Sequence, residues 1–106
     1  MPVVGYLERI ALPALGVNGI TAKVDTGAQT STLDATDMII DDNTICFRLV
    51  TTDKGRRSAP VTLPLLEWRW IRDSGGHPTY RPIVRTEVVL GDGRWVEEFS
   101  LVDRTG

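Results

Sequence analysis

The sequence has one cysteine, Cys46, and one histidine, His77, among its 106 residues. A lone cysteine cannot form a disulfide within the chain, and this composition is typical of a reducing compartment, so we expect the cytoplasm. Zinc sites use three or four ligands drawn from His, Cys and carboxylates. A zinc site built from His77 and scattered carboxylates is possible but disfavoured. The sequence therefore predicts neither a metal nor another cofactor.

Long apolar runs and an excess of one charge are also missing. No run approaches the roughly 20 residues of a membrane helix, and the N-terminus lacks the basic start and apolar core of a secretory signal. The 12 Lys and Arg against 14 Asp and Glu give a formal net charge of -2. Nothing here favours nucleic acid or a membrane surface as a partner. The length predicts one domain over residues 1–106.

Helical periodicity is absent as well, since no stretch keeps a 3.6-residue period over three turns. Short alternating segments take its place. Ile45, Phe47 and Leu49 share one face of a strand over residues 44–51. Residues 83–90 and 94–102 form two strands joined by the turn signal Gly91-Asp92-Gly93. Many short strands with turns between them predict an all-β fold, a small closed barrel with little helix.

The remaining segments are expected to fill in this barrel. A first strand covers residues 3–12, and Asn18-Gly19 predicts a tight hairpin turn. Residues 34–43 favour a short strand or turn. Residues 59–71 are strand-like, but Pro60 and Pro64 each remove a hydrogen-bond donor, which predicts an edge strand or a bulge. Residues 72–81 are expected to form a glycine-bearing loop.

One stretch organises the chain: Asp25-Thr26-Gly27-Ala28, between a strand over residues 19–24 and the extended Ser31-Thr32-Leu33. An ordinary turn would explain Asp and Gly, which are common turn residues. The apolar strand before it and the hydroxyl-rich strand after it favour instead a carboxylate held at a fixed bend.

This stretch resembles the active-site segment of retropepsin-like aspartic proteases. More narrowly, the chain resembles a bacterial family known as ATP-dependent zinc proteases, whose genes are often linked to those of glutamate ligases. The matching segments, in chain order, are Val4-Gly5-Tyr6-Leu7-Glu8, Ala11-Leu12-Pro13, Leu15-Gly16, Ala22-Lys23-Val24-Asp25-Thr26-Gly27-Ala28, Ser31, Gly76-His77, Arg81-Pro82-Ile83-Val84-Arg85-Thr86, Leu90-Gly91 and Trp95.

The resemblance implies an aspartic peptidase with Asp25 as the catalytic carboxylate. Such hydrolysis needs two carboxylates, one ionised as general base and one protonated. No other aspartate of the chain is followed by Thr-Gly or Ser-Gly, so the second must come from another copy, and a two-fold homodimer follows. Thr26 would lock the two loops together, Gly27 would offer backbone groups to substrate, and Ala28 would complete the loop.

By the same resemblance, residues 72–81 would be the flap over the substrate, with Gly75 and Gly76 at its tip. Gln29 would lie beside the cleft, where this chain departs from the family pattern. His77, Arg81 and Arg85, with Arg72, form a basic cluster that would bind an acidic or polyglutamate peptide. A solvated loop explains the same residues. A glutamate ligase is the implied partner.

Several alternatives stay open at this point. The strand and helix that usually prop the active-site loop are expected beyond Gly106, so the fold could bind peptides without cutting them. A metallohydrolase is a weaker reading. Cys46 as a nucleophile would need His77 as its base, and a half-buried core cysteine is favoured. Trp68, Trp70 and Trp95 suit a core or a dimer contact, and the first two could also line a groove.

Overall fold

The structure is a computed structural model of the chain, and it describes residues 6–24, 30–51, 56–72 and 75–103. The elements in chain order are β1 (Tyr6–Leu12), a short 3-10 helix η1 (Pro13–Leu15), β2 (Val17–Val24), β3 (Ser31–Asp41), β4 (Thr44–Leu49), β5 (Val61–Pro64), β6 (Glu67–Arg72), β7 (Pro78–Leu90) and β8 (Gly93–Val102). This confirms the predicted β structure and low helix content. In the described parts of the chain, no helix has the length and hydrophobicity to span a bilayer.

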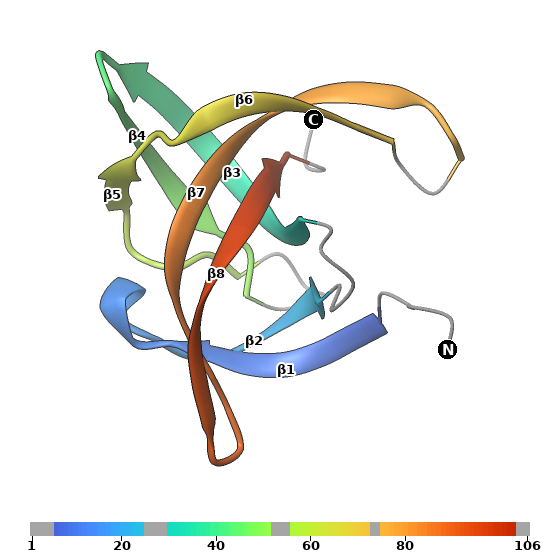
Figure 1. Cartoon of the computed structure of the whole chain (residues 1–106). Helices are drawn as coiled ribbons and strands as arrows, with labels where there is room; N and C mark the ends of the chain where they lie inside the picture. The colour runs from blue at the N-terminus through green and yellow to red at the C-terminus, as the bar shows by residue number, and fades with distance from the viewer. Residues whose placement is uncertain (1–5, 25–29, 52–55, 73–74, 104–106) are drawn as a thin grey trace.

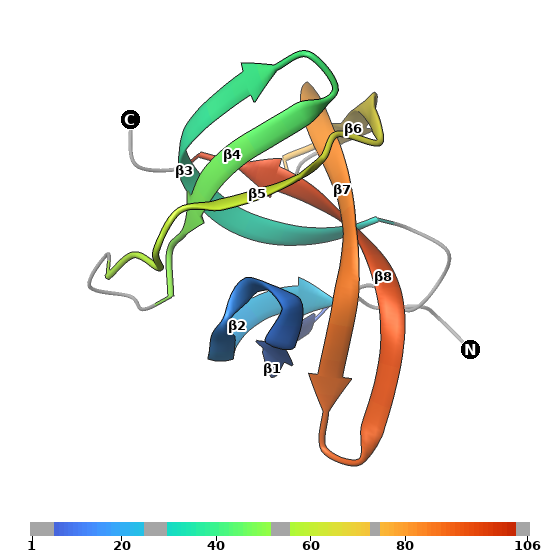
Figure 2. The ribbon, with the colours of Figure 1, turned by 90° about the vertical axis from the view of Figure 1, so that its left-hand side faces the viewer.

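Two long strands, β7 and β8, connect the two ends of the molecule. The sheet order is β2-β1-β7-β8-β3-β4-β5, and β6 pairs with β7. The β1–β2 hairpin lies at one end of this pair of strands, and β3, β4 and β5 lie at the other (Figures 1 and 2). β3 and β8 run parallel to each other, with Ser31 beside Phe99 and Asp34 beside Val102.

The prediction of a closed barrel is wrong, because the sheet curls without closing. Among the described residues, β2 pairs with β3 at Lys23 and Thr32, and β1 pairs with β7 at Ala11 and Val89. In the described residues, β5 and β6 each pair with a single strand. Alternating sequences predict a sheet with one buried face, but closure depends on strand tilt and register, which alternation does not encode.

The core fills the inside of this curve. Ile45, Phe47 and Leu49 are completely buried, which confirms the predicted inner face of β4. Val84 from β7 and Phe99 from β8 belong to the same hydrophobic cluster. Burial of side chains of this size contributes about 1.5–3 kcal/mol each. Leu33 from β3 belongs to the same cluster as Phe99, so the core holds β3 and β8 together.

The turn between β1 and β2 differs from the prediction. The chain reverses at Pro13–Leu15, and Gly16 follows in a left-handed conformation at φ 72°. Asn18 and Gly19 lie inside β2, where Ile20 pairs with Ile10. Proline suits the first position of a helical turn and glycine suits left-handed angles, so Pro13 and Gly16 determine the turn ahead of Asn18-Gly19.

Residues 34–43 also form more regular structure than predicted. β3 continues to Asp41, and only Asp42 and Asn43 form the turn into β4. Asp37 has a positive φ of 54°, at the point where the β3–β4 register shifts between Thr36 and Ile39. This bulge bends β3, which pairs with β8 before the bulge and with β4 on both sides of it.

The proline-containing segment and the predicted loop form an edge of the sheet and a hairpin. Pro64 ends β5, the last strand in the sheet order, which confirms the edge position. The prediction that all of residues 72–81 form a loop is wrong, because β7 begins at Pro78 and Tyr80 pairs with Trp70. Proline is tolerated at the first residue of a strand. The resulting β6–β7 hairpin extends to the upper right of the molecule (Figure 1).

Candidate functional site

The predicted catalytic segment, Asp25 to Gln29, lies outside the described residues. The predictions for Thr26, Gly27 and Ala28 therefore fall outside them as well. The structure describes the strands on either side. β2 ends at Val24, β3 begins at Ser31, and Lys23 pairs with Thr32. The segment therefore leaves one strand and returns on its neighbour. The site can be described from the residues that hold this return point.

Three consecutive hydroxyls mark the return, and each is held by another strand. The Thr30 hydroxyl accepts a hydrogen bond of 2.7 Å from Arg69 of β6. The Ser31 hydroxyl donates to Glu97 of β8. The hydroxyls of Thr32 and Ser100 are hydrogen bonded at 3.2 Å. The start of β3 is thus attached by side chains as well as by its backbone ladder.

Ser100 is the buried centre of this arrangement. It is fully buried, and its hydroxyl accepts a hydrogen bond from Arg81 at 3.4 Å. The same hydroxyl lies 3.4 Å from the carbonyl oxygen of Ser31, to which it can donate. A hydroxyl has one hydrogen and two lone pairs. Donation to Ser31 leaves Ser100 as acceptor for both Arg81 and Thr32, which uses its full hydrogen-bonding capacity.

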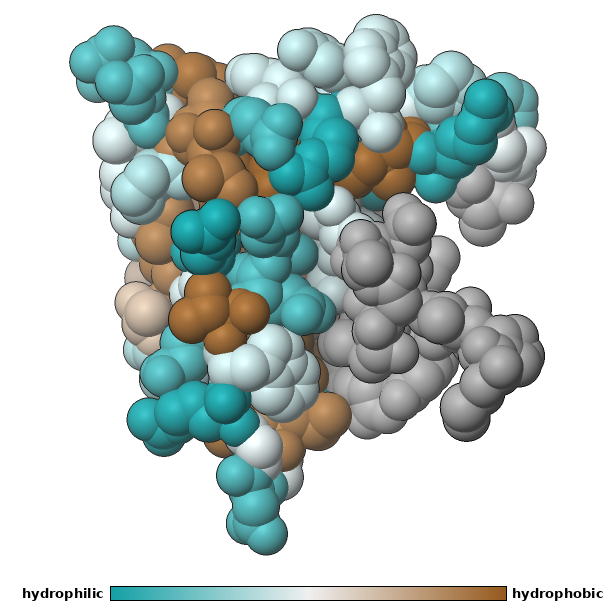
Figure 3. Space-filling view, viewed as in Figure 1, coloured by the Kyte–Doolittle hydropathy of each residue, from teal (hydrophilic) through white to brown (hydrophobic). Residues whose placement is uncertain are grey.

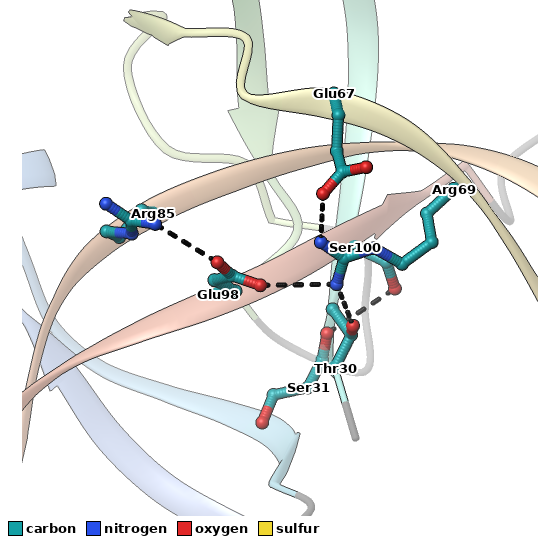
Figure 4. A network of polar contacts seen from close by, with 7 residues as sticks. All are labelled: Thr30, Ser31, Glu67, Arg69, Arg85, Glu98 and Ser100. Atoms are coloured by element: carbon teal, nitrogen blue, oxygen red, sulfur yellow. Dashed lines mark hydrogen bonds and ion pairs between the residues drawn. The ribbon is translucent and has the colours of Figure 1, made fainter. Parts of the chain in front are cut away.

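Arg69, which contacts Thr30, belongs to a charge network of four residues (Figure 4). Arg69 lies 3.2 Å from Glu98 and forms an ion pair with Glu67. The second carboxylate oxygen of Glu98 lies 3.2 Å from Arg85. In the space-filling view, hydrophilic residues gather over the middle of this face, where β6, β7 and β8 run (Figure 3). Two cations and two anions alternate in this network.

Two members of the network, Arg69 and Glu98, have pKa values shifted toward their charged forms. The hydrogen bond from Arg85 is the main reason that the pKa of Glu98 is lowered, with Arg69 adding to the effect and desolvation opposing it. The hydrogen bond to Glu67 is the main reason that the pKa of Arg69 is raised. Each ionised group favours the charged form of its neighbour. Glu98 therefore stays ionised at mildly acidic pH values at which a free carboxylic acid begins to protonate.

The residues predicted to bind substrate are placed in different surroundings. Gly75, Gly76 and His77 are exposed near the tip of the β6–β7 hairpin, where Arg72 donates to the Gly76 carbonyl at 2.9 Å. Arg81 is buried and donates to the Thr79 hydroxyl at 2.7 Å.

Arg85 is exposed but ion paired to Glu98. Arg81 and Arg85 thus each serve contacts within the chain. Their role in substrate binding stays a prediction.

Sequence reasoning missed Arg69, Glu97, Glu98 and Ser100. One signal for Arg69 was available in the sequence. Arg69 stands between Trp68 and Trp70, and side chains alternate along a strand, so Arg69 lies on the opposite face of β6 from both rings. Those rings lie outside the core. Trp70 is 66% exposed and Trp68 39% exposed, and both pack against Tyr80 at ring distances of 4.9 Å and 5.4 Å. Trp95 is partly buried against the core.

A pocket of about 370 Å³ lies between the β3–β4 end of the sheet, the β6–β7 hairpin and the end of β8. Apolar side chains such as Met38, Ile45 and Leu101 line it, and Arg81 contributes a polar group.

In the described residues, no three His, Cys, Asp or Glu side chains come close enough together to hold a metal ion. Cys46 is partly buried on β4.

Comparison with protein families agrees with this arrangement of strands. A model for the RimB-like family, described as the retropepsin-like aspartic endopeptidase RimB, matches residues 3–106. The chain belongs to the RimB-like family. The resemblance to retropepsin-like proteases is thereby confirmed at the level of the family. The description of the RimB-like family does not mention zinc.

Curated relatives of this RimB-like chain carry another name. It is 34% identical over 111 residues to a "Probable alpha-L-glutamate ligase" of Parasynechococcus marenigrum (strain WH8102), with 96% of this chain and 23% of that protein covered. A protein of the same name from Shewanella pealeana (strain ATCC 700345 / ANG-SQ1) is 29% identical over 107 residues, with the same shares covered. The chain spans less than a quarter of the length of these relatives.

A solved structure shares the fold. Protein Lpg0085, of unknown function, from Legionella pneumophila subsp. pneumophila str. Philadelphia 1 superposes with a TM-score of 0.68. The two chains are 24% identical, and the match covers 96% of this chain and 74% of the other. This similarity concerns the fold alone.

Proposed function

We propose that the chain is an aspartic peptidase in which the Asp25 carboxylates of two copies activate one water molecule. The observation that supports this most strongly is the RimB-like family match over residues 3–106, in a chain that carries Asp25-Thr26-Gly27 directly after a strand. The sequence holds one such motif, so the proposed enzyme is a homodimer.

The proposed reaction is general acid–base hydrolysis. One Asp25 is ionised and takes a proton from the water, which attacks the peptide carbonyl carbon. The other Asp25 is protonated and donates its proton to the carbonyl oxygen. The Asp25 that took the water proton then gives it to the nitrogen as the C–N bond breaks, and a hydroxyl of the intermediate returns its proton to the other Asp25. Two adjacent carboxylates share one proton because they cannot both ionise readily, and their two pKa values belong to the pair.

Each neighbouring residue has a proposed role in this scheme. Thr26 links the two loops across the dimer, Gly27 and Ala28 shape the loop, and Gln29 contacts the substrate beside the cleft. The β6–β7 hairpin is the flap, with Gly75, Gly76 and His77 at its tip. Its length and its extension away from the rest of the sheet support this role (Figure 1). The reaction needs no cofactor, and a reducing cytoplasm suits the single Cys46.

The proposed substrate is an acidic or polyglutamate peptide segment. The support is the name of the curated relatives, glutamate ligases, in which a region like this chain is joined to a longer protein. A domain that removes glutamate and a protein that adds it would act on the same chain end. A glutamate ligase is accordingly the proposed partner, with Arg81 and Arg85 as candidate contacts for substrate carboxylates.

A second candidate is a peptide-binding domain without catalysis. It is favoured by one observation: the curated relatives carry the name of a ligase, and this chain matches only 23% of their length. A domain in that setting could present a glutamate-rich tail to the ligase without cutting it.

Cleavage assays on matched aspartate variants separate the two candidates. We would incubate wild type, Asp25→Asn and Asp92→Asn with a glutamate-rich peptide and with its glutamine counterpart. Asp92 is exposed in the β7–β8 turn and serves as control. We expect Asp25→Asn alone to lose cleavage, by roughly 10²–10⁴-fold, while it still dimerises. Equal cleavage by all three would refute the aspartic mechanism, and peptide binding without cleavage by any would support the second candidate.

A further inference from the structure

Arg69 lies where three parts of the chain meet. It belongs to β6, and its Nη1 donates to the Thr30 hydroxyl at 2.7 Å and to Glu98 of β8 at 3.2 Å. Its Nη2 donates to Glu67, two residues away on β6. One guanidinium thus joins the β6–β7 hairpin to the residue just before β3 and to the centre of β8 (Figure 4).

We propose that Arg69 is a positioning residue that holds the β6–β7 hairpin at a fixed place relative to Thr30, and so relative to the proposed active-site segment. Thr30 directly follows that segment in the sequence. This inference rests on the proposed peptidase function for its catalytic consequence. Its structural part, the attachment of the hairpin, holds independently of that function.

The position of β6 in the sheet explains why such an attachment matters. β6 pairs with β7 and with no other strand of the described chain. A two-stranded hairpin is only marginally stable without packing against further structure. The Arg69 contacts supply side-chain links from its outer strand to β8 and to the start of β3. Loss of these links leaves β6 attached through its pairing with β7, so its position relative to Thr30 can shift.

An arginine is suited to this place in a way that a lysine is not. Its planar fork lets separate nitrogens donate to Thr30 and Glu98 on one side and to Glu67 on the other. A lysine ammonium is a compact charge on a flexible stem and cannot keep these directions. Arg85 holds the second oxygen of Glu98 at 3.2 Å, so Glu98 is itself oriented toward Arg69.

The catalytic consequence follows from the demands of geometry. Groups that position a substrate contribute strongly to rate, and a displacement of about 1 Å can cost about a hundredfold. A hairpin that shifts relative to Thr30 would bind peptide less well and would hold it less often in the reactive position. We therefore expect substitutions at Arg69 to raise KM and to lower kcat together.

A double-mutant cycle between Arg69 and Thr30 tests the link. The variants are Arg69→Met, Arg69→Lys, Thr30→Val and the Arg69→Met/Thr30→Val pair. Thr30→Val is the mild variant, since it removes only the hydroxyl and leaves Arg69 both of its carboxylates. Arg94→Met is the matched control, because Arg94 pairs with Glu87 at 3.8 Å on the other hairpin.

We expect Thr30→Val and Arg69→Met each to lower kcat/KM by about tenfold or more, the scale of a hydrogen bond to a charged group. The double variant should be no worse than Arg69→Met, Arg69→Lys should recover part of the loss, and Arg94→Met should match wild type. Additive effects of the two substitutions, or wild-type kinetics in Arg69→Met, would overturn the proposal.

Hydrogen exchange of residues 75–84 decides the structural part without any activity. Arg69→Met and Thr30→Val should exchange faster there than wild type and Arg94→Met, with equal exchange in β4 in all four proteins. Unchanged exchange at residues 75–84 would refute the attachment. If wild type cleaves no peptide but the exchange difference is found, the proposed function fails while the role of Arg69 in holding the hairpin stands.

Discussion

At the start of β3, Thr30, Ser31 and Thr32 each hold a polar contact from another strand, and the contacting residues come from β6 and β8. Hydroxyl-rich strands are common in sheets, so the sequence alone could not assign these three a shared role. The structure shows that they fix the exit of the segment containing Asp25. The proposed catalytic role of Asp25 requires a reproducible geometry, and contacts that hold the neighbouring residues support it.

Replacement of Glu98 by glutamine tests the charge network at the residue scale. Because the pKa of Glu98 is lowered in the folded chain, its contribution to stability is present above its usual value of 4.5 and is lost as the pH falls through the lowered pKa. Glu98→Gln should therefore destabilise the fold at neutral pH. The loss should be no more than about 1 kcal/mol, because Glu98 and its partners Arg69 and Arg85 are partly exposed.

Urea unfolding of wild type and Glu98→Gln over a series of pH values measures this effect. The gap between the two free energies of unfolding should be constant near neutrality and should shrink at acidic pH. A gap that grows as the pH falls would contradict the assigned direction of the pKa shift.

Replacement of Thr86 by valine should stabilise the fold. Thr86 is buried on β7, and its hydroxyl has no hydrogen-bond partner among the described residues. A buried unpaired hydroxyl costs about 1–3 kcal/mol, and valine has a similar shape without it. Thermal unfolding should show a gain of about 1 kcal/mol in the free energy of unfolding. A loss of stability in Thr86→Val would show that the hydroxyl makes a bond after all.

Strands were predicted best where one face is buried and the alternation is strict. β4 is the clearest case, since Ile45, Phe47 and Leu49 are all fully buried. The β7–β8 hairpin was predicted from its glycines, and Leu90 pairs with Gly93 across the turn. The turn predicted at Asn18-Gly19 was wrong because the chain turns at Pro13–Gly16 instead. Both segments contain turn-forming residues, and local turn preferences alone do not decide between them.

Long-range contacts could not be predicted. Nothing in the sequence shows that Arg69 contacts Thr30, 39 residues away, or that Arg81 is buried against Ser100. The first contact depends on the parallel pairing of β3 with β8, and the second depends on the antiparallel pairing of β7 with β8. Closure of the barrel failed as a prediction for the same reason, because it is a property of register and tilt.

Truncation of Phe47 tests the core at the element scale. The ring is fully buried on β4 within the hydrophobic cluster, and Phe→Ala changes at such sites cost about 3–5 kcal/mol. Ile39→Ala on β3 is the control, since Ile39 is 63% exposed, and it should cost less than about 1 kcal/mol. Urea unfolding of both variants checks this. Equal effects of the two substitutions would contradict the assigned core.

At the scale of the whole molecule, the proposed function makes oligomerisation a condition of activity. The chain has one Asp-Thr-Gly, and an isologous two-fold interface brings a residue near its own symmetry mate. The Asp25 pair would then exist only in the dimer. Activity per chain should fall on dilution below the dimer dissociation constant, in step with the dimer fraction measured by sedimentation.

Mixing wild type with an excess of Asp25→Asn protein tests the paired carboxylates most directly. Subunit exchange would place wild-type chains in mixed dimers, which have one Asp25 carboxylate and should not cleave peptide. We predict that wild-type activity falls toward zero as the variant is added, while Asp92→Asn added in the same amounts leaves it unchanged. Full wild-type activity in mixtures shown to contain mixed dimers would mean that each chain carries a complete site, and would contradict the proposed mechanism.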